Sequence, residues 1–222
     1  GFFADRLQGG LQRDALQLLG GDAVVASDNP TPAAFVERAK ALGLQSVTTL
    51  GFPTMGRASD AQGGASKLVA LKSVEPGYPL RGVLHLSQGP GQPDLEVRAI
   101  PESGHAWVDA PLLEALGLKL GDRLLLGDAS FHISHIIAIE PDRGAGFMSF
   151  APRVMINSAD LPATRLVQPA SRITYRLAVA AQADAGRGAE RAAQDYLGWA
   201  QELAKSLHGV RVESLESGRP EM

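Results

Sequence analysis

Apolar residues near the start of the chain recur first at helical and then at strand spacing. Phe3, Leu7, Leu11 and Leu18 follow a near-heptad series, which favours an amphipathic helix that ends at two glycines. The stretch after these glycines is almost continuously apolar, as in a strand buried on both faces. The same alternation then repeats. It predicts helices at 3–19 and 32–42 and strands at 22–27 and 44–52.

The last part of the chain returns to this pattern. Its clearest feature is an apolar stripe at spacings of three and four residues, formed by Ala192, Tyr196, Trp199, Leu203 and Leu207. This stripe predicts a helix over 187–207. Strands are predicted at 153–156, 172–179 and 210–212. We therefore expect the two ends of the chain to form one layer of helices packed on a sheet.

The middle of the chain has a different pattern, with short apolar runs separated by glycine, proline and aspartate. The pair Gly127-Asp128 is typical of a hairpin turn between two such runs. Strands are predicted at 67–74, 82–86, 95–99, 123–126 and 130–139, and a short helix at 111–116, into which residues 106–109 lead. Closely spaced strands of this kind favour a small antiparallel sheet or barrel.

These two patterns together predict an α+β fold with a discontinuous organisation. Residues 1–62 and 150–222 are expected to form a mixed α/β subdomain, and residues 63–149 a β-rich subdomain inserted into it. The chain is long enough for either one large domain or two small ones.

Composition narrows the classes of function. The net charge of −3 and the lack of a basic run argue against nucleic acid as a partner. The chain has no cysteine, which excludes disulfides, thiolate nucleophiles and cysteine-rich zinc sites. No apolar run approaches the roughly 20 residues of a membrane span.

A search for catalytic or metal-binding patterns is negative. His132 and His135 are three apart on a predicted strand, and strand alternation would point their rings to opposite faces. Ser103, His105 and the carboxylates Asp109 and Glu114 could form a triad only by a chance convergence. Residues 140–143, Glu-Pro-Asp-Arg, are interpreted as a solvated turn with a local ion pair. We therefore predict no catalytic residue, no cofactor and no metal.

One segment is unusually apolar for its loop-like surroundings. Phe147, Met148 and Phe150 stand beside glycines and just before a proline. They could be ordinary core residues at the entry to a strand. The alternative is a hydrophobic contact site, because exposed apolar patches mark binding surfaces.

The same region carries a family resemblance. Residues Glu140 to Arg176 begin EPDRGAGFMSFAPRVMIN, and four other stretches accompany them in order: GDAVVASDNP, GYPLRG, LGLKLGDRLLLGDASFHI and VESLESGRPEM. This ordered set is similar to the periplasmic segment of the YbbP-type permeases, within the FtsX/MacB superfamily of ABC transporters. The resemblance covers essentially the whole chain.

The resemblance implies a MacB-like periplasmic core located between the first and second transmembrane helices of an inner-membrane permease. Phe3 and Glu221 would then lie close together, near those two helices. ATP hydrolysis would occur in a separate cytoplasmic ABC ATPase subunit, and the domain would transmit the resulting movement (mechanotransmission). A second periplasmic domain or a periplasmic protein is a further possible partner, and lipid or another hydrophobic molecule a possible substrate. The alternative is a stand-alone periplasmic binding or assembly module for a hydrophobic ligand or protein.

Overall fold

The computed structural model describes residues 15–144, 150–182 and 186–215. Phe3 and Glu221, which were predicted to lie close together, are outside these residues. The chain divides into two compact units. The first comprises Gly1–Thr48, Pro79–Val83 and Tyr175–Met222, and the second comprises Thr49–Tyr78 and Leu84–Thr174. The division predicted from sequence, with an insert at 63–149, stays a prediction.

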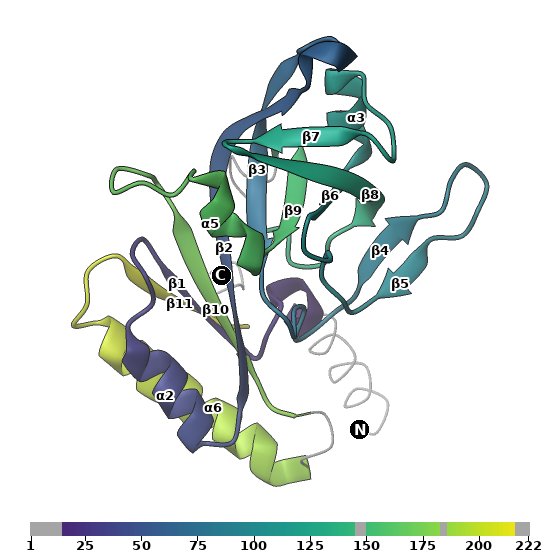
Figure 1. Ribbon diagram of the computed structural model, residues 1–222. Helices are drawn as coiled ribbons and strands as arrows, with labels where there is room; N and C mark the ends of the chain where they lie inside the picture. The colour runs from purple at the N-terminus through teal and green to yellow at the C-terminus, as the bar shows by residue number, and fades with distance from the viewer. Residues whose placement is uncertain (1–14, 145–149, 183–185, 216–222) are drawn as a thin grey trace. The chain divides into compact units, whose positions relative to one another are not determined.

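The first unit is a layer of two helices on a small sheet. Strand β1 (Ala23–Ser27) lies between β10 (Thr174–Ala180) and β11 (Val210–Glu213) and is antiparallel to both. Helices α2 (Ala33–Ala41) and α6 (Gly186–Ala204) run side by side along it (Figure 1). The helices predicted at 32–42 and 187–207 and the strands predicted at 22–27, 172–179 and 210–212 are therefore present, with ends that differ by a few residues. Most of the helix predicted at 3–19 lies outside the described residues.

The core of the first unit forms between these helices and the sheet. Val25, Phe35, Leu177 and Tyr196 are buried in one cluster, and the Tyr196 hydroxyl donates a hydrogen bond to the Phe35 carbonyl at 2.9 Å. Burial raises the pKa of this hydroxyl. The other residues of the predicted stripe on α6, including Trp199, pack against the same cluster. The helical period in the sequence thus identified the buried face of α6.

The second unit is built on a closed ring of strands. Its strands are the second part of β2 (Gln45–Ala58), β3 (Ser66–Val74), β4 (Leu84–Ser87), β5 (Leu95–Val97), β6 (His105–Val108), β7 (Arg123–Leu126), β8 (Ala129–Ile139) and β9 (Arg153–Asn157). Pairing runs from β2 through β3, β9, β6, β8 and β7 back to β2 (Figure 1). These strands therefore form a small barrel, and β4 and β5 extend the sheet from β8.

The sequence favoured a small antiparallel sheet or barrel; the strands do form a barrel, but it is mixed rather than antiparallel. The pairs β3–β9 and β6–β8 are parallel. Inward positions of the strands alternate with outward ones, and Leu71, Leu124, Phe131 and Ile156 are fully buried inward residues. Helix α3 (Ala110–Leu116), helix α5 (Leu161–Thr164) and the short 3₁₀ segments η1 (Asp60–Gln62) and η2 (Ser158–Asp160) complete this unit.

The turn between β7 and β8 is packed tightly against the end of α5. Gly127 has a φ of +56°, and a Cβ atom added there would overlap the carbonyl oxygen of Thr164 and the side chain of Leu166. The same carbonyl accepts a hydrogen bond from the Asp128 amide at 2.9 Å. The hairpin predicted at Gly127-Asp128 is confirmed. Its first residue must be glycine because the backbone has a positive φ and because no space is left for a Cβ atom.

Candidate functional site

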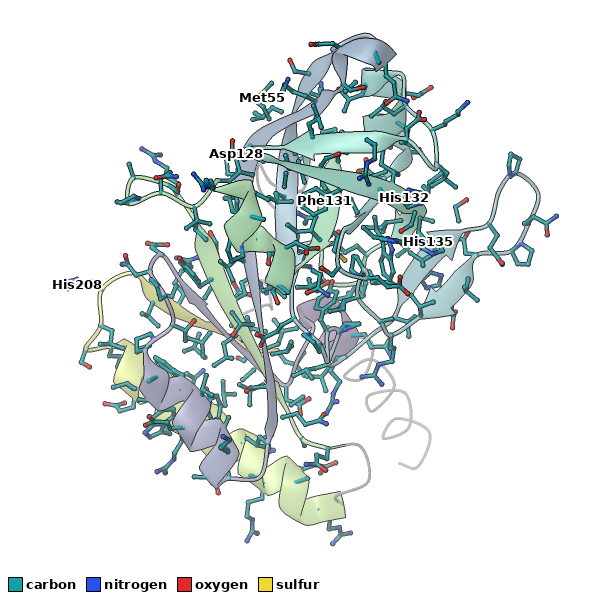
Figure 2. All side chains as sticks on the ribbon, in the orientation of Figure 1. Met55, Asp128, Phe131, His132, His135 and His208 are labelled. Carbon is teal, nitrogen blue, oxygen red and sulfur yellow. The ribbon has the colours of Figure 1, made fainter. Side chains whose placement is uncertain are left out.

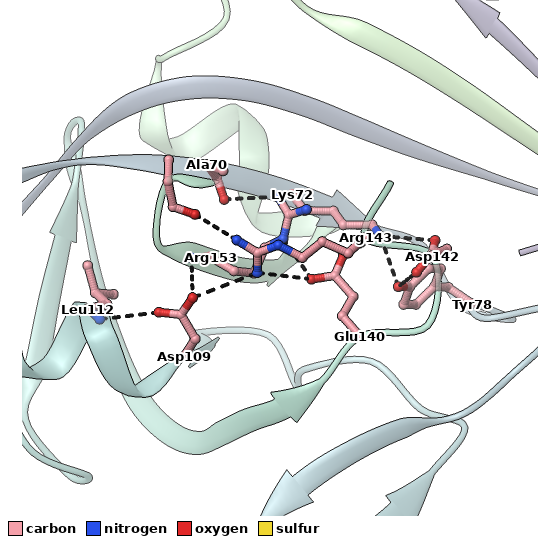
Figure 3. Close-up of polar contacts among 10 residues, drawn as sticks. Ala70, Lys72, Tyr78, Asp109, Leu112, Glu140, Asp142, Arg143 and Arg153 are labelled. Carbon is pink, nitrogen blue, oxygen red and sulfur yellow. Dashed lines mark hydrogen bonds and ion pairs between the residues drawn. The ribbon is translucent and has the colours of Figure 1, made fainter. Parts of the chain in front are cut away.

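The loop from β8 to β9, residues 140–152, is closed at its base by buried polar contacts (Figure 3). Arg153 Nε donates a hydrogen bond to Glu140 Oε1 at 2.8 Å, and these two side chains are 5% and 1% exposed. Above them, Arg143 donates to the Ala151 carbonyl at 2.7 Å. The first residue of the loop is therefore bound directly to the residue that follows its end. We call the connection at 140–152 the β8–β9 loop; the structure describes its residues 140–144 and 150–152.

Lys72 attaches this loop to the outer side of β3. Its ammonium group donates to Glu140 Oε2 at 2.8 Å, to Asp142 Oδ2 at 3.0 Å and to the Tyr78 hydroxyl at 3.0 Å. The Tyr78 hydroxyl in turn donates to Asp142 Oδ1 at 2.7 Å. All three donor directions of the ammonium group are thereby used.

Asp109 completes the cluster at the start of α3. It caps the helix by accepting from the Leu112 amide, and it accepts from the Arg153 amide at 2.9 Å. Arg143 lies 3.7 Å from the same carboxylate. The resulting group has three cations and three carboxylates, which balance in charge. We call it the charge network: Lys72, Arg143, Arg153, Asp109, Glu140 and Asp142.

The network controls the ionisation of its most buried members. Burial by itself would raise the pKa of Glu140, but the positive charges of Lys72 and Arg153 and their hydrogen bonds outweigh it and lower the pKa from 4.5 to about 2. Burial and the negative charges of Asp142 and Glu140 raise the pKa of Tyr78. Glu140 is therefore a carboxylate at every physiological pH.

The arrangement positions a loop. Every charged member of the network is bound to other members or to the backbone. Among the residues that the structure describes, no group of three or more His, Asp or Glu is placed to hold a metal ion.

We predict that this network makes stability depend on acid pH. Because the pKa of Glu140 is lowered on folding, its contribution is complete above about pH 4.5 and is lost as the pH falls towards 2. The difference in unfolding free energy between the parent chain and Glu140→Gln should therefore shrink by about 2 kcal/mol between pH 6 and pH 3. Urea unfolding at both pH values measures this. A difference that stays constant with pH would contradict the prediction.

Phe150 is the one predicted contact residue that the structure describes, and it lies on the surface. Its side chain is 86% exposed, whereas Ala151 and Arg153, one and three residues later, are buried. Phe147 and Met148 fall outside the described residues. The hydrophobic contact site formed by these three residues remains a prediction, and Phe150 has the exposure that such a site requires.

The histidines are arranged differently from the sequence expectation. A bulge in β8 pairs His132 with His105 and His135 with Trp107, so both rings lie on the same face of the sheet (Figure 2). The ring centroids of the first pair are 5.0 Å apart and those of the second 5.5 Å. The expected opposite orientation is therefore wrong, because the extra residue of the bulge restores the direction of the side chain.

The other residues of the hypothetical triad have separate structural roles. The Ser103 hydroxyl donates to Asp160 at 2.6 Å, and Asp109 caps α3 and binds Arg153. His105 has Glu102 as its nearest carboxylate, at 3.9 Å. The structure does not bring Ser103, His105 and Asp109 into a hydrogen-bonded series.

The charge network was missed from sequence. The local ion pair predicted at 140–143 is present, since Arg143 lies 3.8 Å from Glu140, but the predicted solvation of this turn is wrong for Glu140. Its partner Lys72 is 68 residues away, and both side chains are buried. A signal was present: Lys72 interrupts the apolar run of β3, and Glu140 directly follows the apolar end of β8. A lone charge within a buried strand requires a partner, but the sequence does not name it.

Comparisons with known proteins agree with the fold. No protein-family model matches the sequence. The uncharacterized ABC transporter permease YbbP of Escherichia coli (strain K12) is 34% identical over 176 residues, which are 79% of this chain and 20% of that protein. The chain thus spans about a fifth of the length of this relative.

Two solved structures have the same fold at low sequence identity. The periplasmic region of MacB from Actinobacillus actinomycetemcomitans has a TM-score of 0.50 and 12% identity, covering 91% of this chain and 92% of that one. The extracellular domain of the noncanonic ABC-type transporter YknZ from Gram-positive bacteria has a TM-score of 0.50 and 11% identity, covering 86% and 100%. In the described residues, no helix is both long and apolar enough to cross a membrane. The chain is therefore a relative of part of a YbbP-like ABC transporter permease, with the α+β fold of a MacB-like periplasmic region.

Proposed function

We propose that the chain is the extracytoplasmic domain of an ABC transporter permease, located in the periplasm, that engages a hydrophobic substrate or partner and transmits ATP-driven conformational change across the membrane. A cytoplasmic ABC ATPase subunit hydrolyses ATP, and the permease's own transmembrane helices connect it to this domain. Lipid or another hydrophobic molecule is the expected cargo. A second periplasmic domain or a periplasmic protein is a further possible partner.

The observation that carries this proposal is the exposed Phe150 on the β8–β9 loop, whose base is fixed by buried ion pairs. Phe150 is 86% exposed, so its aromatic ring is available to a partner, and burying that ring on binding would be favourable. The β8–β9 loop that carries it is anchored at its base by the Glu140–Arg153 pair and by Lys72. A contact residue on a rigid base loses little conformational entropy on binding, which favours engagement of a ligand.

A label at position 150 tests whether this loop responds to ATP. Because the chain has no cysteine, Phe150→Cys gives one reactive site on this domain for a bimane fluorophore. We expect its emission to change when ATP is added to the permease reconstituted with its ATPase in nanodiscs, with any other cysteines of the permease replaced. The change should be absent when the ATPase carries a substitution that blocks hydrolysis.

The control is Leu95→Cys, at an exposed apolar position on β5 away from the loop. This label reports effects of nucleotide on the dye that do not depend on the loop, and its response should be smaller. An emission at position 150 that does not respond to ATP, or that responds equally with the inactive ATPase, would contradict transmission to this loop.

A further inference from the structure

Two imidazole rings lie next to each other on the outer side of the barrel. His105 on β6 and His132 on β8 are partners in the parallel register, and their ring centroids are 5.0 Å apart. Phe131 and Ile133, on either side of His132, are buried in the barrel, so alternation along the strand directs the His132 ring outward (Figure 2). Both histidines are partly exposed, and the His105 side chain is 33% exposed. An ion can therefore reach both rings from solvent.

Backbone hydrogen bonds hold the two strands in place at this pair. The His105 amide donates to the Glu102 carbonyl at 3.0 Å, which closes a turn at the start of β6. The His132 amide donates to the Gly104 carbonyl in this turn at 2.9 Å. Asp160 fixes the turn as well, because its carboxylate accepts from the Gly104 amide at 2.7 Å. The rings therefore project from fixed backbone positions, and little ordering is needed to bring one nitrogen of each to a shared ion.

The separation of the rings matches that of two histidines bound to one metal ion. A zinc–nitrogen bond is about 2.0–2.1 Å long, which places the metal about 3.2 Å from the centre of each imidazole ring. At coordination angles of about 90–110°, two such rings have their centres about 4.5–5.2 Å apart. The observed 5.0 Å lies within this range. The rings are also inclined at 59° to each other, so they are not stacked face to face.

Two charged side chains of opposite sign flank the pair. Glu102 Oε2 is 3.9 Å from His105 Nε2, and Arg123 on β7 is the cross-strand partner of His132. The carboxylate favours a bound cation and the guanidinium group opposes it, so the two effects partly cancel. Both side chains are exposed, which weakens their influence further. The donor atoms of the rings therefore decide which ion fits.

We propose that His105 and His132 bind a divalent transition-metal ion, Zn²⁺ or Cu²⁺. Imidazole nitrogen suits these metals, whereas Mg²⁺ and Ca²⁺ prefer oxygen ligands. Among the described residues, no Asp, Glu or further His completes a group of three with this pair, so water fills the remaining positions. Binding is therefore reversible, with a Kd for Zn²⁺ of about 10–100 µM, weaker than at a four-ligand structural site. The sequence expectation of no metal paired His132 with His135, whereas the structure pairs it with His105.

Two other histidines of the second unit have different neighbours. His135 contacts the ring of Trp107, whose nitrogen is a hydrogen-bond donor only and cannot bind a metal. His85 on β4 has Glu96 and Ile139 as its register partners, and Glu96 Oε1 is 4.0 Å from its Nε2. His85 is thus a partly exposed histidine beside a carboxylate, like His105, but without a histidine opposite it. It is the matched control for the pair.

The test is a titration of the untagged, ¹⁵N-labelled 222-residue chain with ZnCl₂, followed through the NMR signals of the histidine side chains. We expect the signals of His105 and His132 to shift together, with one Kd. His105→Phe and His132→Phe keep an aromatic ring but remove its nitrogens, and each should weaken binding at least about 10-fold. His85→Phe should leave the Kd unchanged. MgCl₂ at the same concentrations should shift neither signal.

Two charge variants and an unfolding measurement separate metal binding from a purely structural role of the rings. Arg123→Gln should tighten Zn²⁺ binding about 2- to 5-fold, and Glu102→Gln should weaken it by a similar factor. Because the ion binds the folded pair, about 1 mM Zn²⁺ should shift the urea unfolding equilibrium about 10- to 100-fold toward the folded state. This shift should be absent in His132→Phe.

Three results would overturn the proposal. They are no saturable shift up to about 1 mM Zn²⁺, an affinity that His105→Phe or His132→Phe leaves unchanged, and an equal loss of affinity in His85→Phe. The first two would leave the pair as a ring contact only, and the third would place the ion elsewhere. The proposal does not rest on the proposed function, because the label at position 150 responds to ATP, or fails to, whether or not these histidines bind a metal.

Discussion

Replacement of Glu140 by glutamine is expected to lower the free energy of unfolding of the second unit by about 3–5 kcal/mol at neutral pH. The glutamate is the shared partner of Lys72 and Arg153, at 2.8 Å from each, and all three side chains are buried. Removing its charge leaves two desolvated cations without their nearest anion, which costs far more than an exposed ion pair contributes. Trp107 fluorescence during urea unfolding measures the effect, in a Trp199→Phe background where Trp107 is the one remaining tryptophan.

Two further variants show whether the loss comes from the buried charges. Glu96→Gln removes a carboxylate that is 66% exposed and should change stability by less than about 0.5 kcal/mol. Adding Lys72→Met to Glu140→Gln should cost less than Lys72→Met costs alone, because the uncompensated ammonium group is removed. Additive effects of the two substitutions would show that Lys72 and Glu140 do not stabilise each other.

Gly127→Ala is expected to destabilise the second unit by at least about 3 kcal/mol. Its positive φ disfavours any L side chain, and the added Cβ would overlap the Thr164 carbonyl. Relief of this overlap would require the β7–β8 turn to move away from α5, which would break the hydrogen bond between the Asp128 amide and Thr164. The same unfolding measurement detects the loss.

Gly117→Ala is the matched control for this substitution. Gly117 has a similar φ of +63°, but no atom lies within 4 Å of the position where its Cβ would be. Only the conformational cost of the left-handed backbone applies there, about 1–2 kcal/mol. If both substitutions cost the same, the close approach of Thr164 contributes nothing and the spatial argument for Gly127 is wrong.

Local patterns in the sequence predicted the elements well, because their causes are local. The period of α6 identified Tyr196 and Trp199 on its packed face, and Gly127-Asp128 marked the β7–β8 turn. The MacB-like α+β fold was expected from the ordered set of motifs and is confirmed by the structural comparisons. The parallel pairs β3–β9 and β6–β8 were not foreseen, since strand direction depends on connections that hydrophobic alternation does not encode.

The functional site was only partly predictable for the same reason. Phe150 was selected from its apolar neighbours in sequence, and its exposure agrees with a contact role. The charge network joins Lys72 to Glu140 and Asp142. Lys72 comes close to these two carboxylates only after the barrel has formed. The orientation of His135 depends on a bulge, and a single inserted residue has no clear signature in one sequence.

The boundary between the two units has a practical consequence for dissecting the protein. Thr48 belongs to the first unit and Thr49 to the second, and both lie inside the continuous strand β2. Domains are normally separated by cutting an exposed linker, but here the cut would divide a hydrogen-bonded strand. A fragment that starts at Thr49 would begin with a frayed strand end. Engineering either unit as an independent module therefore requires that β2 be kept whole.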